Sequence, residues 1–385
     1  MKLYSHIHFF HPFTPPKMTI KPYFFIVSVL LFLASSCRHQ QTEEESIILD
    51  ENSVTEFAMH IEQSVLNGKP EVYNNAFDKE YLKSLIRDNS IVNSSLDADF
   101  GQDYFESNFH LGDEAVQIVG NGGDFRFVRY YLNEIDSSHH IVFRTYNDFT
   151  LNFFDYIIDT ANGQLAIKNG FIYNTGCNFS DNIRENILLN VLYKTNPEGI
   201  TSTLSTIKEL SDNGRHKEAI QLLKKHEAEL SDLTYYWQLY IANLYQTCPK
   251  EQYIDSLKQL KEKGLDYRMC LLHQMMFYLN EGMVEANDST ITQLIEYAGD
   301  DPIFLLIFGK TNYYAKQYET ALGCYEAADE YLPPLWDLWY GKLECYDKLK
   351  ETERFNQCLE AGKKNYGMTD EDLNQLKKNH FPGQK

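Results

Sequence analysis

Asp155 is the ionisable residue whose setting is most typical of a chemical site. It lies in an otherwise apolar segment, LNFFDYII, which has the composition of a strand. Alternation along a strand places Asp155 on the same side as Phe153. If that side lines a pocket, Asp155 would be a buried acid that takes part in ligand binding or proton transfer. Arg126 and Arg144 lie on neighbouring segments and could instead pair with Asp155, which would make its role structural.

Two other patterns fit a chemical motif less well. The Gly-Asn-Gly-Gly segment at 120–123 is followed by Asp124 and a strand, whereas a phosphate loop needs Lys-Ser/Thr and a helix, so we interpret it as a hairpin turn. His139 and His140 are neighbours on a strand and point to opposite faces, which favours a surface turn over a metal site. No Ser/His/Asp, HExxH or Cys/His set has a spacing typical of catalysis. We therefore predict no catalytic residue, no metal site and no cofactor.

The charge and the cysteines limit the classes of function. The formal net charge is -20 and no stretch of clustered Lys and Arg is present, which argues against a nucleic-acid partner. None of the seven cysteines has CxxC spacing, so a zinc site is not expected. Those that lie in helical repeats are typical of small buried hydrophobic residues, and we expect most of them to be unpaired.

Residues 1–36 are typical of an export signal, with Met18 as a candidate true start. Lys21 is followed by an apolar core at 23–33 that is too short to span a membrane comfortably, and then by Ala-Ser-Ser-Cys ending at Cys37. This pattern resembles the bacterial lipoprotein signal, in which the Cys becomes the lipidated N-terminus. The alternatives are an uncleaved anchor and a plain signal peptide. The resemblance implies lipidation at Cys37 and a membrane contact through the lipid.

Residues 37–49 are expected to form a flexible tether, because RHQQTEEES is polar and carries an acidic run. In the Gram-negative lipoproteins that this start resembles, an Asp after the lipidated Cys favours retention in the inner membrane. Arg38 stands there instead. The resemblance thus implies a lipid-anchored location in the bacterial cell envelope, at the outer membrane, on either its periplasmic or its surface face.

Residues 50–195 are expected to form an α+β domain with helices on one face of an antiparallel meander sheet. Helical spacing runs through 54–65 and continues at Phe77, Tyr81 and Leu82, and a further helical piece is expected at 100–109. The period then changes to two, and strands are expected at 116–118, 125–131, 141–145, 150–158 and 165–171, between Gly/Asn/Asp turns. This order of elements is similar to cystatin-like and nuclear-transport-factor-2-like domains, whose members range from enzymes to binding modules.

From residue 200 the sequence repeats with a spacing of 34 residues, five times without a gap, over 200–369. The repeat is recognised from columns of mostly apolar residues whose offsets follow helical spacing, so that each repeat is expected to be two short amphipathic helices. One column is Ala219, Tyr253, Asn287, Ala321 and Phe355. The column sixteen residues earlier is Thr203, Trp237, Leu271, Leu305 and Trp339. Residues 370–385 are expected to form a capping helix and a tail.

The columns resemble the tetratricopeptide repeat, and the fourth repeat matches that pattern best. Its matching residues are Leu305, Phe308, Gly309, Ala321, Tyr325, Ala328 and Pro333. Tyr253 and Asn287 stand where this family usually has a small Ala. The resemblance implies an all-α solenoid in which the first helices of the repeats line a concave face that binds a protein or peptide.

The residues that the repeat alignment places on the concave face are apolar and rich in tyrosine. They are Tyr235, Gln238, Tyr245, Met269, Leu272, Met276, Leu306, Lys310, Tyr313, Tyr314 and Tyr340. Asp337, Glu344 and Asp347 make the last repeat acidic, which favours an apolar or basic peptide over an acidic one. The sequence therefore predicts a lipid-anchored envelope adaptor with a protein or peptide partner. The alternatives are a small-ligand-binding or enzymatic α+β domain with the repeats as a docking arm, and a purely structural spacer.

Overall fold

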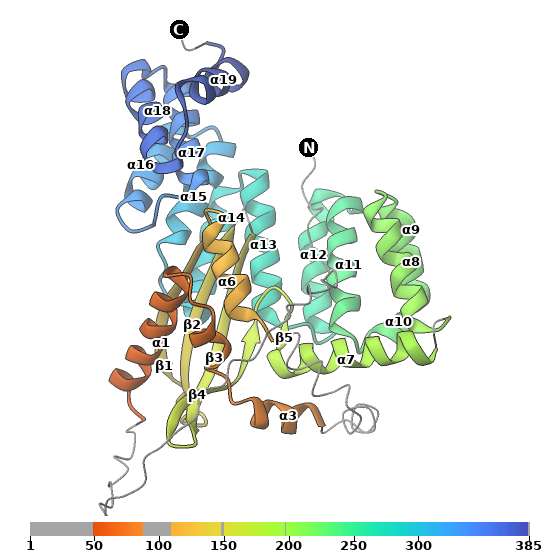
Figure 1. Ribbon diagram of the computed structural model, residues 1–385. Coiled ribbons are helices and arrows are strands. Elements are labelled where there is room, and N and C mark those ends of the chain that lie inside the picture. The colour runs from red at the N-terminus through yellow and green to blue at the C-terminus, as the bar shows by residue number, and fades with distance from the viewer. Residues whose placement is uncertain (1–48, 88–108, 148–149, 197, 384–385) are drawn as a thin grey trace, which may run out of the picture. The chain divides into compact units, whose positions relative to one another are not determined.

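The computed structural model describes residues 49–87, 109–147, 150–196 and 198–383. Within these ranges a region with an antiparallel sheet comes first, and a largely helical part, residues 200–381, follows it (Figure 1). The predicted signal peptide, the lipidation site Cys37, nearly all of the tether and most of the helical piece expected at 100–109 lie outside the described residues.

The first helix, α1 (Glu51–Leu66), begins where the sequence provides a cap. The backbone N–H of Ser53 donates to the carboxylate of Asp50 at 2.8 Å, and the side chain of Ser53 completes a capping box. Its buried stripe contains Val54, Ala58 and Ile61, at the spacing of one helix face. The short helix α2 (Glu71–Asn74) and helix α3 (Lys79–Arg87) follow it.

The sheet has five strands in the order β1-β2-β3-β4-β5, and all neighbours are antiparallel. The expectation of a meander is confirmed. The strands are β1 (Asp124–Leu132), β2 (His139–Asn147), β3 (Thr150–Ala161), β4 (Gln164–Ile172) and the two-residue β5 (Cys177–Asn178).

Both faces of the sheet are covered. On β2, Ile141 and Phe143 face a core that the sheet shares with α1, α2, α3, α6 (Leu111–Gly120) and α7 (Phe179–Thr195). On the opposite face of β2, Val142 and Tyr146 face a second core, which the sheet shares with the helical part. The sequence predicted helices on one face, which is confirmed, but it did not indicate what covers the other.

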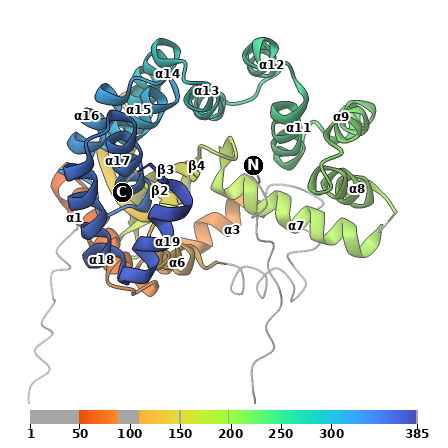
Figure 2. The ribbon, with the colours of Figure 1, turned by 90° about the horizontal axis from the view of Figure 1, so that it is seen from above.

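The helical part consists of five consecutive helix pairs and a last helix. The pairs are α8 (Ile200–Asp212) with α9 (His216–Lys225), α11 (Thr234–Thr247) with α12 (Lys250–Glu262), α13 (Tyr267–Glu281) with α14 (Val284–Ala298), α15 (Ile303–Tyr314) with α16 (Tyr318–Asp329), and α17 (Trp336–Leu349) with α18 (Thr352–Tyr366). The short α10 (Glu227–Leu230) lies between the first two pairs, and α19 (Asp370–His380) ends the part. In Figure 2 the pairs follow one another in chain order.

The repeat columns coincide with these helices. The column that begins at Ala219 falls on the second helix of every pair, and all five of its side chains are at most 2% exposed. Asn287, which departs from the usual Ala, is buried and donates to the hydroxyl of Thr311 at 2.6 Å. The predicted capping helix is α19, which begins with a capping box between Thr369 and Asp372.

Three local predictions are wrong. Val116 and Ile118 belong to α6, because the acidic residues Asp113 and Glu114 in the first turn and the apolar spacing that follows favour a helix over a strand. The Gly-Asn-Gly-Gly segment therefore connects a helix to a strand and is not a hairpin turn. Phe77 lies before α3 and forms a bridge with Ile167 of β4, instead of continuing the helical spacing.

Candidate functional site

The residues predicted to line the concave face all lie on the first helices of the pairs, and the structure divides them into two groups. Met269, Leu272, Leu306 and Lys310 are buried, with exposed fractions of at most 6%. The others remain partly or largely exposed: Tyr235, Gln238, Tyr245, Met276, Tyr313, Tyr314 and Tyr340. In this conformation the first group is not accessible to a partner.

Most of the buried group lies against the protein's own sheet: Leu272 and Leu306 belong to the core that the sheet shares with the helices, and Lys310 donates to Tyr146 of β2. Met269 packs instead with residues of α11 and α12.

The ring of Phe153 on β3 lies 5.8 Å from that of Phe304 on α15, centroid to centroid. The guanidinium of Arg268 on α13 lies 3.3 Å from the ring centroid of Phe171 on β4. The face that the sequence assigned to a partner is therefore, over part of α13 and α15, an internal contact.

Arg144 is the central charge of this contact. It is fully buried on β2, pairs with Asp124 of β1, and lies 3.1 Å from the carboxylate of Asp301, just before α15. Asp301 also accepts the backbone N–H of Ile303 at 2.7 Å. Burial raises the pKa of Asp301, and the Arg144 charge opposes that rise. Arg144 thus compensates two buried carboxylates, one from the sheet and one from the helical part.

A second polar contact joins the end of β2 to α15 and α17. The ammonium of Lys310 lies 3.0 Å from the carboxylate of Asp337 and donates to the hydroxyl of Tyr146 at 3.0 Å. That hydroxyl donates in turn to Asp337. Burial and the charge of Asp337 raise the pKa of Tyr146, so its hydroxyl keeps its proton. Lys310 therefore has a structural role in this conformation, although the sequence placed it at a partner site.

The sequence suggested Arg126 or Arg144 as an ion-pair partner of Asp155. The structure gives Asp155 other partners. It is buried on the sheet face that meets the helical part, and its carboxylate accepts from the hydroxyl of Tyr131 at 2.7 Å. One oxygen lies 2.8 Å from Nδ1 of His140, and the other lies 3.7 Å from the guanidinium of Arg268. Asp155 is therefore held between partners from the sheet and from α13.

His140 connects Asp155 to the turn between β1 and β2. Its Nε2 lies 2.8 Å from the hydroxyl oxygen of Ser138, which completes a Ser–His–Asp chain of hydrogen bonds. This is the connectivity of a nucleophilic triad. However, the Ser138 hydroxyl also donates to Asp136 at 2.6 Å, which holds it within the turn. The histidine is buried, so the prediction of a surface turn is wrong for His140.

Sequence spacing did not reveal this chain of hydrogen bonds. Ser138 and His140 lie two positions apart in one hairpin, but Asp155 comes close to His140 only because β2 and β3 pair in a register that places Val142 opposite Asp155. The usable signal was an acid and a histidine on the same face of two strands predicted to be neighbours.

The exposed group contains a cluster of tyrosines around a carboxylate, formed by Tyr313, Tyr314 and Tyr340 with Glu344. Tyr314 at the end of α15 is 47% exposed, and its ring lies 5.9 Å from that of Tyr313. The Tyr313 hydroxyl donates to Glu344 of α17 at 3.2 Å. We call these four residues the tyrosine–Glu344 cluster.

The electrostatics of this cluster favour a cationic ligand group. Burial raises the pKa of Glu344, although the hydrogen bond from Tyr313 opposes the rise. Burial and the charge of Glu344 raise the pKa of Tyr313, so this hydroxyl remains a donor. Aromatic ring faces beside a partly desolvated carboxylate attract ammonium and guanidinium groups.

The six described cysteines are all unpaired. Residues 49–383, where they are described, contain no group of three or more His, Cys, Asp or Glu side chains that could hold a metal ion. None of the helices in these ranges is both long and apolar enough to cross a membrane. Comparison of the chain with protein-family models, with curated proteins and with solved structures finds no match.

Proposed function

We propose that this protein is a lipid-anchored adaptor of a bacterial cell envelope that binds a protein or peptide partner. Its helix pairs would form a solenoid of the tetratricopeptide type. The burial of the 34-residue columns supports this proposal, because side chains that recur at a fixed period and pack between successive pairs are typical of repeat proteins. Lipidation at Cys37 would hold the chain at the outer membrane.

The tyrosine–Glu344 cluster carries the proposal for the binding site. The partner would bind there, because the buried part of the same face already holds the sheet. Three tyrosines offer a large, rigid contact area, and Glu344 adds a negative charge, on which the charges of Lys348 and Lys310 also act. A peptide with a Lys or Arg side chain next to apolar residues fits this chemistry, whereas an acidic tail would be repelled.

Photo-crosslinking in intact cells tests the proposal. A photo-reactive phenylalanine analogue would replace Tyr314, and the matched control would place it at Tyr193 of α7, which is 64% exposed. We expect one discrete protein adduct from position 314 and none from position 193. Glu344→Gln should weaken capture at position 314 about five- to tenfold, as the loss of one desolvated charge pair does. Equal labelling from both positions would rule out the cluster as the binding site.

The lipid anchor has a separate test. Cys37→Ala should release the protein from membranes that are washed with high salt. A variant that still fractionates with membranes after the wash would contradict lipidation at this position. This result is independent of the cross-linking result, since it concerns the location of the protein and not its partner.

A second candidate function is hydrolysis by the α+β domain, which the hydrogen-bonded chain of Ser138, His140 and Asp155 supports. A serine nucleophile would react with a fluorophosphonate probe, and the reaction would be lost in Ser138→Ala. The hydrogen bond from Ser138 to Asp136 leads us to expect no labelling, because it draws the hydroxyl proton away from the histidine. Labelling that depends on both Ser138 and His140 would favour the enzyme.

A further inference from the structure

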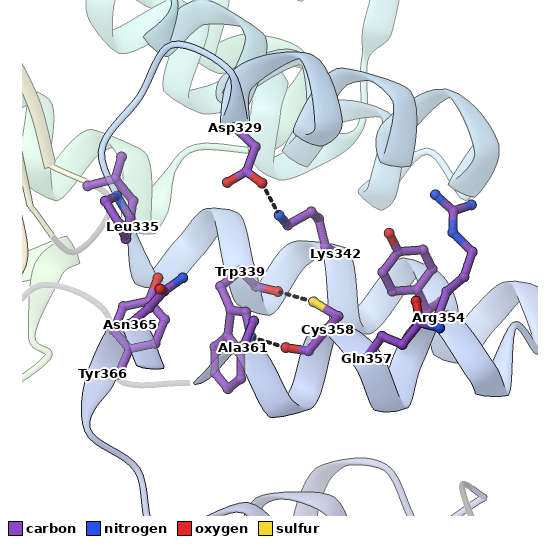
Figure 3. Close-up of a pocket in the computed structure, with 12 residues that line it drawn as sticks. Asp329, Leu335, Trp339, Lys342, Arg354, Gln357, Cys358, Ala361, Asn365 and Tyr366 are labelled. Atoms are coloured by element: carbon purple, nitrogen blue, oxygen red, sulfur yellow. Dashed lines mark hydrogen bonds and ion pairs between the residues drawn. The ribbon is translucent and has the colours of Figure 1, made fainter. Parts of the chain in front are cut away.

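Helix α17 has two faces with different roles. One of them packs against α16 and α18 and lines a cavity of about 390 Å³ (Figure 3). On this face Trp339 is 3% exposed and donates its ring N–H to the carbonyl of Cys358 at 2.7 Å. Figure 3 also shows Lys342 pointing toward Asp329, with which it forms an ion pair of 2.5 Å. These polar groups are bonded within the protein, so this face serves the fold.

The other face of α17 carries a row of three residues that are four positions apart: Trp336, Tyr340 and Glu344. Residues with this spacing lie above one another on a helix, so the row runs along the helix axis. The rings of Trp336 and Tyr340 are stacked, with 6.1 Å between their centroids and 15° between their planes. Trp336 therefore extends the tyrosine–Glu344 cluster toward the start of α17.

Trp336 is the member of the row that a partner can cover most profitably. Its side chain is 40% exposed, and tryptophan is enriched among the interface residues whose truncation weakens binding most. The ring is also held in place, because it packs against Trp339 at 4.9 Å and Tyr366 at 5.5 Å, centroid to centroid. A ring that is already ordered loses little conformational entropy when a partner binds. Trp336 is thus suited to receive an apolar side chain.

The charges beside the row favour one cationic group. Asp337 lies 3.0 Å from the ammonium of Lys310, and Asp347 lies 3.5 Å from that of Lys348. Glu344 is a third carboxylate, on which both of these lysines also act. Of these five groups three are negative and two are positive, so a single Lys or Arg side chain of a partner complements them.

The row also fixes the distance between the apolar and the charged end. Trp336 and Glu344 are eight residues apart on one helix, which places their Cα atoms about 12 Å apart along the axis. In an extended segment that rises about 3.3 Å per residue, this distance corresponds to four residues, and side chains four apart point to the same side. The Tyr313 hydroxyl of α15 reaches Glu344 at 3.2 Å, so the two helices leave no groove between them as wide as a helix, about 10 Å.

We propose that the partner segment is extended and is held by two anchors: a Lys or Arg side chain at Glu344, and an apolar or aromatic side chain on Trp336, four residues away in either chain direction. This inference rests on the proposed function and adds to it the conformation of the partner and the spacing of its anchors. Tyr340, between the two anchors, is covered by the residues that connect them.

Binding of synthetic peptides to the full-length protein in detergent tests the spacing. Fluorescein-labelled peptides of twelve residues would carry one Lys and one Phe in a Gly/Ser background, three, four, five or eight positions apart and in both orders. Fluorescence polarisation would be followed to about 1 mM protein, since two anchors supply a weak affinity. We expect the separation of four to bind at least about fivefold more tightly than three or five, which turn one anchor to the other side. An optimum at eight, equal affinities at all separations, or no binding of any peptide would overturn the proposal.

Trp336→Ala tests the apolar anchor. It should weaken binding of the peptide with separation four about tenfold, and it should not change the affinity of the same peptide with Ala in place of Phe. Trp336→Phe keeps a ring on Tyr340 and should bind within about threefold of the native protein, which separates loss of the anchor from a general defect. The matched control is Tyr331→Ala, because Tyr331 is 59% exposed and lies before α17, outside the row. Equal affinities of Trp336→Ala and Tyr331→Ala would overturn the role of Trp336.

The proposed function and this inference fail in different experiments. If position 314 gave no discrete adduct in cells, the partner site itself would be contradicted. A discrete adduct at position 314 that is unchanged by Trp336→Ala, together with no adduct from a photo-reactive group at position 336, would leave the partner site in place and overturn the two-anchor binding mode.

Discussion

Replacing Arg144 with methionine tests whether buried ion pairs hold the sheet against the helical part. Arg144 is fully buried, and its two partners, Asp124 and Asp301, are 4% and 0% exposed. Methionine fills much of the space of the arginine stem, so the main effect is that two buried carboxylates lose their cation. Removing one partner of a buried ion pair costs about 3–5 kcal/mol. We expect the free energy of unfolding of Arg144→Met to fall by that amount near neutral pH.

The effect should depend on pH in a defined direction. Burial raises the pKa of Asp301, so over the range between its unfolded and folded pKa values the folded state binds more protons than the unfolded state. Stability therefore falls as pH rises through that range. Without Arg144 the pKa of Asp301 in the folded state rises further, since the positive charge that opposed the rise is gone. The stability difference between the variant and the native protein should therefore shrink as the pH is lowered from about 7 to about 5.

Urea unfolding followed by circular dichroism at both pH values measures this difference. The matched control is Arg126→Met, because Arg126 lies on the neighbouring strand and donates to the carbonyl of Tyr331 at 2.9 Å, where water can replace the contact. The free energy of unfolding of Arg126→Met should be less than about 1 kcal/mol below that of the native protein at either pH. If Arg144→Met lost as little as the control, or lost the same amount at both pH values, the ion pairs would not hold the sheet in place.

Two further predictions concern the helix pairs. Burial lowers the pKa of His273 on α13 to about 4. Between about pH 4 and 6.5 the unfolded state therefore binds more protons than the folded state. The free energy of unfolding of the native protein should fall by roughly 1–2 kcal/mol when the pH is lowered from about 7 to about 5. His273→Gln should not show this loss, and an unchanged pH profile in the variant would contradict the assignment. A Cβ atom at Gly341 would lie 2.6 Å from the ring of the buried Tyr325, so Gly341→Ala should cost about 1–3 kcal/mol in thermal or urea unfolding. Gly323→Ala on α16 is the control, since a Cβ there meets nothing within 4 Å, and it should be neutral or stabilising; equal losses in both would refute the packing argument.

The parts of the fold that depend on local periodicity could be predicted from the sequence. The 34-residue columns predicted two helices within each repeat, because the residues of one helix face recur every three to four positions whatever packs against that face. The strands from β1 to β4 were recognised from alternation between Gly/Asn/Asp turns. The exception is α6, where a short apolar segment beside a glycine-rich turn fits a strand or a helix equally well.

The sequence could not predict which elements cover the second face of the sheet and the inner face of the helix pairs, because this depends on contacts between residues far apart in the chain. Tyr146 alternates with Thr145 as expected for a strand, but nothing in its neighbourhood indicates that its hydroxyl reaches Asp337, 191 residues later. For the same reason the sequence assigned Lys310 to a partner site. Asp155 was singled out because its segment is otherwise apolar, but its partners His140 and Arg268 come from a register and a helix position that spacing does not fix.

The energetics of the sheet contact decide where a partner can bind. The sheet and the turn that follows β4 contribute six apolar or aromatic side chains to the core shared with the helical part, each at most 8% exposed: Val142, Tyr146, Leu151, Phe153, Phe171 and Tyr173. Burial of one such side chain stabilises by about 1.5–3 kcal/mol, so separating the sheet from the helices would cost on the order of 10 kcal/mol before any ion pair is counted. A peptide that binds with micromolar affinity supplies about 8 kcal/mol in total. Such a peptide cannot displace the sheet, which supports the proposed site beside it, on the tyrosines and Glu344 that the sheet leaves partly exposed.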